Sequence, residues 1–147
     1  MMRHLLALAC ALLTIGCTEP TPAPADRKVR ISIGNSGSEP LECRMMFGHW
    51  VERELGILQK GSGEINVDVL QQKKDGALFI MRADGQRRMM IENIFCARRG
   101  DWQASVGQID LAAVRVGRPV MVLVSCRLPE NGGRVDCGKP YLMDNHL

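Results

Sequence analysis

The sequence predicts an all-β fold, and more closely a β-sandwich of about seven strands that is immunoglobulin-like in shape, with one short helix. Two observations predict it. From Val29 onward, apolar residues recur at every second position, which is the period of a strand with one buried face. Turn residues separate these runs at short intervals, as they do in sandwiches of antiparallel strands.

Six apolar or alternating runs mark the expected strands. They lie at residues 29–33, 41–47, 65–69, 78–81, 89–96 and 120–128. Asp84-Gly85 is the expected turn between the fourth and fifth runs, and a last hairpin beyond residue 128 adds a seventh strand. A turn of helix is expected within residues 52–60. Asp110 is expected to cap a short helix, Leu111–Val114, that stops near Gly117.

The first seventeen residues have the pattern of an export signal. Arg3 and His4 precede an apolar run, residues 5–15, that is too short to span a bilayer. Gly16-Cys17 follows, and the next ten residues are polar and rich in proline. This pattern resembles the lipobox of bacterial lipoproteins, although Thr14 stands where that family usually has leucine.

The resemblance implies that Cys17 is acylated, with palmitate-type chains, and becomes the new N-terminus. It divides the chain into a signal peptide (1–16), a lipidated cysteine with a proline-rich linker (17–27) and a single domain (28–147). The domain would then face the periplasm or the surface at a bacterial cell envelope. Thr18, where an aspartate would favour the inner membrane, favours the outer membrane. The alternative is ordinary cleavage after Ala25, which would remove Cys17.

Four cysteines in the expected domain predict two disulfides, because exported chains keep such bridges. If Asn131-Gly132 is a two-residue hairpin turn, Cys126 lies opposite Cys137 within disulfide range. Cys43 and Cys96 then pair by elimination. This second bridge closes the longer loop and is expected to cross the core, so its loss should cost more. A zinc site is the alternative, but the chain has no C-x-x-C spacing.

The charge balance argues against a nucleic-acid binder. The leader holds one of the 19 basic residues and none of the 16 acidic ones, which leaves 18 against 16 in the rest of the chain. The arginine pairs at 87–88 and 98–99 are too scattered to form a basic stripe. Aromatic residues make up 4% of the chain, too few for a platform on which bases or sugars stack.

Met45 and His49 are the first candidate binding residues. A thioether and an imidazole suit copper in an oxidising compartment, so a periplasmic copper-type module is one possible function. The alternative is that Met45 packs in the core, since it shares strand parity with Cys43. No cofactor is expected.

Glu92 is the second candidate. It shares parity with the apolar Met90, Ile94 and Cys96, and a carboxylate on a buried face must be paired, protonated or near a cleft. A pair with His49 would suit a small envelope hydrolase. The favoured alternative is a structural ion pair with a nearby arginine (Arg44, Arg82 or Arg98).

His49 and Trp50 are expected at the edge of the main recognition surface, because Gly48 breaks the strand alternation just before them. Trp50 is expected to be half-buried with its indole N–H free, and tryptophan is enriched among binding hot spots. The alternative is that Trp50 only caps the core. The leading hypothesis is therefore a non-enzymatic envelope lipoprotein that is anchored by lipid and binds an envelope protein or another envelope component.

Overall fold

Alternating apolar residues form strands that are the main secondary structure of the described residues, so the predicted all-β class is confirmed. The computed structural model describes residues 26–144. Ten strands are present where about seven were expected, together with three short helices. The strands are β1 (Arg27–Asn35), β2 (Leu41–Phe47), β3 (Val51–Leu58), β4 (Glu64–Gln71), β5 (Leu78–Met81), β6 (Arg88–Arg98), β7 (Gly107–Ile109), β8 (Met121–Arg127), β9 (Asp136–Cys137) and β10 (Tyr141–Met143). The helices are η1 (Gly48–Trp50), α1 (Trp102–Ser105) and α2 (Ala112–Val116).

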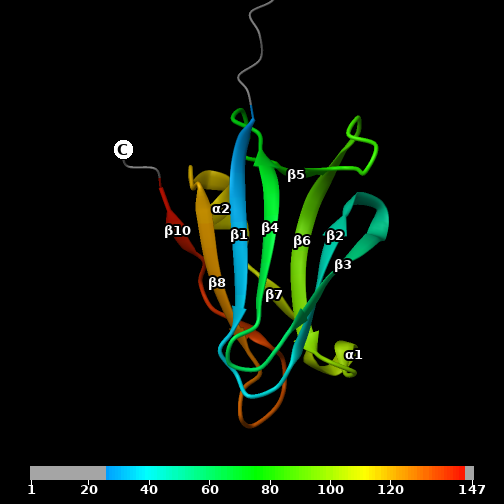
Figure 1. Ribbon diagram of the computed structural model, residues 1–147, viewed down its shortest axis with the longest axis vertical. Coiled ribbons are helices and arrows are strands. Elements are labelled where there is room, and N and C mark those ends of the chain that lie inside the picture. Colours follow the sequence, from blue (N-terminus) through cyan, green and yellow to red (C-terminus); the bar gives the residue numbers. More distant parts are fainter. Residues whose placement is uncertain (1–25, 145–147) are drawn as a thin grey trace, which may run out of the picture.

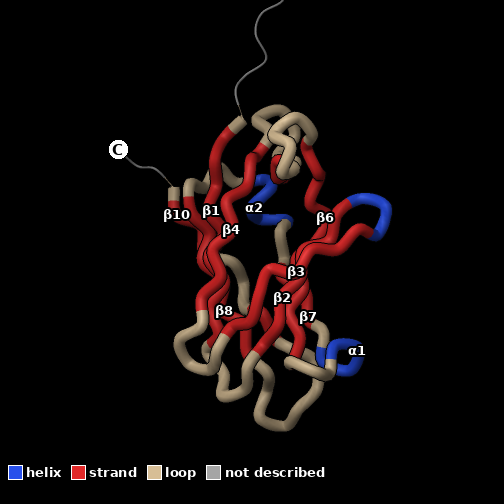
Figure 2. Tube along the Cα trace, turned by 45° about the vertical axis from the view of Figure 1, so that its right-hand side comes forward, coloured by secondary structure: helices blue, strands red, loops and turns tan. Residues whose placement is uncertain are grey.

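The strands follow the order β10-β8-β1-β4-β5-β6-β2-β3. Neighbours are antiparallel except β1 and β8, which run parallel. The long strand β6 joins two layers: its first residues pair with β5, and its later residues pair with β2 and β7. One layer therefore holds β10, β8, β1, β4 and β5, and the other holds β3, β2, β7 and the second half of β6 (Figures 1 and 2).

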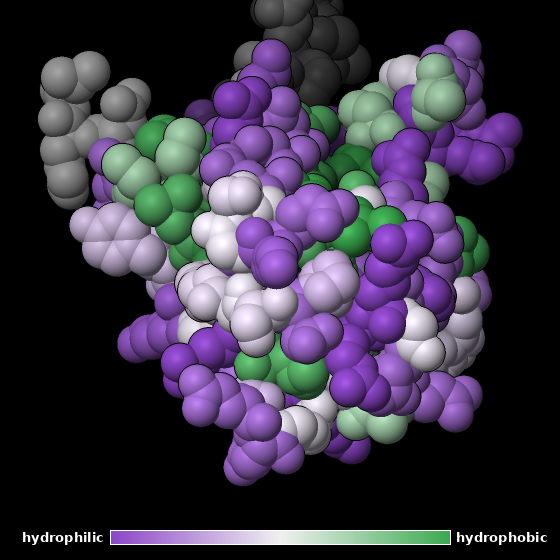
Figure 3. All heavy atoms as spheres, turned by 60° about the horizontal axis from the view of Figure 1, so that its bottom comes forward, coloured by the Kyte–Doolittle hydropathy of each residue, from purple (hydrophilic) through white to green (hydrophobic). Residues whose placement is uncertain are grey.

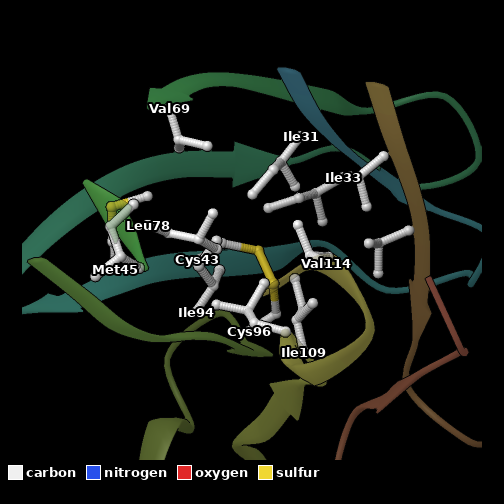
Figure 4. Packing of buried hydrophobic residues seen from close by; sticks show 14 of the residues in the cluster. Ile31, Ile33, Cys43, Met45, Val69, Leu78, Ile94, Cys96, Ile109 and Val114 are labelled. Atoms are coloured by element: carbon white, nitrogen blue, oxygen red, sulfur yellow. A yellow bond between two sulfur atoms is a disulfide. The ribbon is translucent and has the colours of Figure 1, made fainter. Parts of the chain in front are cut away.

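The core lies between these layers. Ile31 and Ile33 of β1 point into it from one layer, Met45 of β2 and Ile94 of β6 point into it from the other, and Val114 of α2 lies among them (Figure 4). All five side chains are fully buried. Methionine in the core accords with its use as an adaptable apolar filler, so Met45 packs as strand parity predicts.

Both predicted disulfides are present. Cys126 and Cys137 lie opposite each other in the β8–β9 ladder, with their Cα atoms 4.0 Å apart. The register matches the prediction, but the turn does not: the Gly132 N–H donates to the Pro129 carbonyl, within a loop of residues 128–135. The register survives because this longer loop is centred on the same pair of residues.

The Cys43–Cys96 bridge does not cross the core, contrary to expectation. The two cysteines are direct partners on the adjacent strands β2 and β6, with a Cα–Cα distance of 4.1 Å. It differs in this from the bridge between sheets in antibody domains. The sulfurs of Cys96, Cys126 and Cys137 nevertheless lie within 4.8 Å of one another, so the two bridges pack together in the interior.

The two helical predictions have opposite outcomes. The helix after Asp110 is present as α2: the Asp110 carboxylate accepts the Ala112 N–H at 2.9 Å, and the helix ends at Gly117. The turn of helix expected within residues 52–60 is wrong, because this segment is strand β3. Its residues are mostly exposed and pair with β2 alone along the sheet edge, so no alternation marks them as a strand.

The sequence did not predict β3, β7, β10 or α1. The expected signal peptide, Cys17 and most of the expected linker lie outside the described residues. Within residues 26–144, no helix is long and apolar enough to cross a bilayer.

Candidate functional site

The turn between β2 and β3 presents the most exposed aromatic side chain of the described residues. β2 ends at Phe47, and Gly48, His49 and Trp50 form the single turn η1 before β3 begins at Val51. This turn, the β2–β3 tip, projects from the side of the body (Figures 1 and 2). Trp50 is 86% exposed. The indole was expected to be half-buried, and both that expectation and the alternative of a core cap are therefore wrong.

The backbone of the β2–β3 tip is strained. His49 and Trp50 have φ angles of 64° and 62°, and within residues 26–144 they are the only residues other than glycine with positive φ. The left-handed region is unfavourable for side chains with a Cβ, and a bulky residue there is a true outlier. The surrounding structure must hold the conformation. Phe47 and Val51, paired across the base of the tip, provide that support.

Trp102, the second tryptophan of the chain, is packed against other residues and serves as a comparison for Trp50. Trp102 in α1 is half-buried, and the Arg44 guanidinium lies 4.0 Å from the centre of its ring. Arg44 in turn pairs with Glu42 and Glu52 at 3.4 Å each. Trp102 therefore has packing partners that account for its presence, whereas the exposure of Trp50 leaves most of its surface without any.

A shallow groove of about 240 Å³ lies beside the β2–β3 tip. Its apolar lining comes from both sides of the groove: Phe47 and Val51 from the β2–β3 hairpin, and Ile80, Met81 and Met89 from the β5–β6 hairpin. Glu52, Arg53 and Arg82 add charge at its border. The sequence did not predict this groove, because residues 52–60 were expected to contain a turn of helix.

Glu92 does not lie on the buried face of β6. Met46 pairs with Asn93 and Phe47 pairs with Ile91, so Glu92 is the extra residue of a bulge. A bulge reverses the alternation of a strand. Ile94 and Ile91 are buried on either side of it, while Met90 and Glu92 are exposed.

The structure also contradicts the expected ion pair of Glu92. Within residues 26–144, Arg44 pairs with Glu42 and Glu52, Arg98 pairs with Asp101, and no ion pair includes Glu92. Its carboxylate lies beside the start of the tip instead: Oε1 would be 3.8 Å from a Cβ placed on Gly48.

The described residues do not place His49 with Glu92 in one hollow, or with Met45 on one surface. The hollow that Glu92 lines is shared with Leu78, Met90 and Arg115, and His49 does not line it. Met45 is fully buried and His49 is exposed, so the two candidate ligands do not share a surface. The one cluster of potential ligands among the described residues is Cys96, Cys126 and Cys137, whose sulfurs are held in disulfides.

Comparisons of the chain with protein-family models, with curated proteins and with solved structures give no match. The candidate site therefore rests on the geometry of the β2–β3 tip and the groove beside it.

Proposed function

We propose that the chain is a cell-envelope lipoprotein, anchored through Cys17, whose β-domain binds an envelope protein or another envelope component without catalysing a reaction. The observation that carries the binding role is Trp50, 86% exposed on a left-handed backbone. A strained turn lowers stability, and an exposed indole forgoes the stabilisation that burial of its apolar surface would give. A partner that covers the indole would supply that burial.

The groove beside the tip supports the same role. Interface hot spots are well-packed aromatic anchors surrounded by residues that exclude water. Trp50 supplies the anchor, and Val51 and Met81 supply exposed apolar surface in the groove. Arg53 and Arg82 lie at its border with Glu52, whose carboxylate already pairs with Arg44. This arrangement fits a partner with a small apolar pocket for the indole and an acidic rim.

The anchoring role is supported by the sequence pattern around Cys17 and by the position at which the fold begins. β1 starts at Arg27, ten residues beyond Cys17. Prolines at 20, 22 and 24 favour extended geometry of about 3 Å per residue, so the linker spans about 30 Å. The domain would work close to the membrane that holds its anchor.

The binding role is tested by a photoreactive amino acid placed at position 50 in cells, with the same residue at Gln103 as a matched exposed control on α1. We expect one discrete crosslinked species from position 50 that excess unlabelled protein removes and that Gln103 does not form. Equal crosslinking from both positions would contradict a specific site at the tip.

The anchoring role has its own test in the intact mass of the processed chain. We expect a chain that begins at Cys17 with attached acyl groups, and we expect Cys17→Ala to release the domain from membranes or to block processing. An unmodified chain that begins at Asp26 would contradict it.

A further inference from the structure

A basic hollow of about 460 Å³ lies at the end of the domain where β1 begins. Arg27, Lys73, Lys74 and Arg118 line it, against the single carboxylate of Asp75. Within residues 26–144, none of these four cations lies within 4.0 Å of a carboxylate oxygen. We call these four residues and Val116, which also lines the hollow, the basic end.

The hollow has a rigid frame. The buried Gln71 amide donates to the carbonyls of Val114 at 2.8 Å and Gly117 at 3.1 Å, which joins the end of β4 to the end of α2. Gly76 packs so closely that a Cβ there would lie 1.9 Å from the Arg115 carbonyl oxygen. Arg115 also lines the hollow but is not one of the four cations, because its guanidinium donates hydrogen bonds to the Ile91 and Glu92 carbonyls of β6. The four cations are therefore carried on backbone that is held in place.

Val116 lines the same hollow as the four cations and is 88% exposed. It is the last residue of α2. At a lipid headgroup layer, both buried apolar surface and attraction between cations and anionic lipids contribute to binding. A small soluble anion would use the cations but would gain nothing from Val116.

The chain from Cys17 enters the domain at the basic end, and this position indicates which surface the basic end faces. Arg27 is the first residue of β1, at the upper end of Figure 1, beside the β4–β5 loop that carries Lys73 and Lys74. Arg88, at the start of β6, pairs with Asp26 at 2.6 Å and holds the chain entry at this end. A linker of about 30 Å from Cys17 therefore attaches the domain by the same end that carries the cations.

We propose that the basic end docks on the phosphate groups of anionic phospholipids in the membrane that holds the anchor. The inference rests on the proposed lipid anchoring. Each lysine or arginine held at an anionic surface is worth roughly a fivefold gain in binding, and the effect fades within a Debye length of about 10 Å at 0.1 M salt. The short linker keeps the domain near enough for this attraction to act. The β2–β3 tip would then extend sideways along the membrane.

The opposite end of the domain supplies a matched control. Three exposed cations lie in loops at this opposite end: Lys60 after β3, Arg99 after β6 and Arg134 after β8. Figure 3 views the molecule with this end turned forward and shows mainly hydrophilic side chains. The test variant is Lys73→Gln/Lys74→Gln/Arg118→Gln, and the control is Lys60→Gln/Arg99→Gln/Arg134→Gln. Both remove three exposed cations, and both should keep the melting temperature of the parent protein.

The experiment places the acylated protein in vesicles of phosphatidylcholine alone or with about a third phosphatidylglycerol. Val116→Cys carries an environment-sensitive fluorophore, since the other cysteines of the processed chain are acylated or in disulfides. In anionic vesicles we expect a blue shift and quenching by nitroxide-labelled headgroups. Both should be absent from neutral vesicles, lost at about 0.5 M salt and lost in the test variant, but retained in the control variant.

The proposal would be overturned by equal signals in neutral and anionic vesicles, by an unchanged signal in the test variant, or by an equal loss in the control. A further measurement compares the effect of inorganic phosphate on the anionic-vesicle signal with that of chloride at equal ionic strength. Release by phosphate alone would show a small-anion site in place of headgroup docking.

The same vesicles separate failure of docking from failure of anchoring. Intact mass shows whether Cys17 is acylated, and if it is not, the unanchored chain is sedimented with both kinds of vesicle. Docking then predicts binding to anionic vesicles only, reduced roughly a hundredfold in the test variant. Absence of that binding overturns docking whatever the state of Cys17.

Discussion

The β2–β3 and β5–β6 hairpins line the same groove from its two sides, yet their turns are built on different principles. The β5–β6 turn places Gly85 at the left-handed position, with a φ of 67°, and its N–H donates to the Arg82 carbonyl at 2.9 Å. The Asp84 carboxylate accepts the N–H groups of Gln86 and Arg87. The β2–β3 turn places His49 and Trp50 in left-handed conformations instead.

The requirements of folding explain the residues of the β5–β6 turn, but they do not explain those of the β2–β3 turn. Glycine and aspartate are the residues that turn geometry favours, so the β5–β6 turn needs no further reason. An exposed tryptophan at a left-handed position works against folding, and such outliers occur where a surrounding structure supports a functional element. The β2–β3 tip is therefore where we expect function, and the β5–β6 turn is its structural counterpart.

The largest expected effect comes from removing the bridge that supports both hairpins. Cys43 of β2 and Cys96 of β6 close a loop with a sequence separation of 53, and their replacement by alanine should lower the free energy of unfolding by about 4 kcal/mol. The same change at Cys126 and Cys137, with a separation of 11, should cost about 3 kcal/mol. Urea unfolding measures both. A greater loss from the second pair would show that loop length does not set the order.

Trp50→Ala separates binding from stability at the β2–β3 tip. We expect partner binding to fall at least tenfold, or about 1.4 kcal/mol, because the indole is the proposed anchor. The free energy of unfolding should change by no more than about 0.5 kcal/mol, since the side chain is exposed. Titration of the captured partner and chemical denaturation measure the two quantities.

Tyr141→Ala, at an exposed position on β10, is the control for Trp50→Ala and should leave binding unchanged. A stability loss of about 3–5 kcal/mol in Trp50→Ala, with unchanged binding per folded molecule, would show that Trp50 is structural.

A reciprocal pair of substitutions compares the two turns directly. His49→Gly should raise the free energy of unfolding by about 1 kcal/mol, because glycine adopts positive φ without a steric cost. Gly85→Ala should lower it by about 1 kcal/mol, and since no atom lies within 4 Å of the new Cβ, the change reports the backbone alone. Thermal unfolding measures both. If the two substitutions shift stability in the same direction, the backbone of the β2–β3 tip is not strained.

The smallest expected effect is a pH dependence at the β5–β6 turn. Hydrogen bonds from the Gln86 and Arg87 N–H groups lower the pKa of Asp84 below its ordinary value of 3.8. A carboxyl whose pKa is lower in the folded chain stabilises the fold above its unfolded pKa and loses that contribution as the pH falls through its folded pKa. The melting temperature of Asp84→Asn should therefore lie below that of the parent at neutral pH and approach it on acidification below about pH 4. A constant difference across that range would show that the charge of Asp84 is not involved.

Local patterns in the sequence determined a large part of this fold. Alternation located β1, β2, β4, β6 and β8, because each is long and buries one face against the core. The register of Cys126 and Cys137 followed from the centre of a hairpin loop, and Asp110 and Gly117 marked the ends of α2. In each case the residues that determine the conformation are neighbours in the chain.

Tertiary structure alone decided the features on which the candidate site depends. β3 carries no alternation because most of its side chains are exposed, so its pairing with β2 is not visible in its own residues. Glu92 turns outward because a bulge opposite Met46 and Phe47 reverses the strand parity, and the position of a bulge depends on the partner strand. Sequence alternation says which side of a strand is buried only while the register is continuous. Where the register breaks, contacts between distant segments determine which side chains are buried. Such contacts leave Trp50 exposed to solvent. They also place the basic side chains of the β4–β5 loop beside the start of β1.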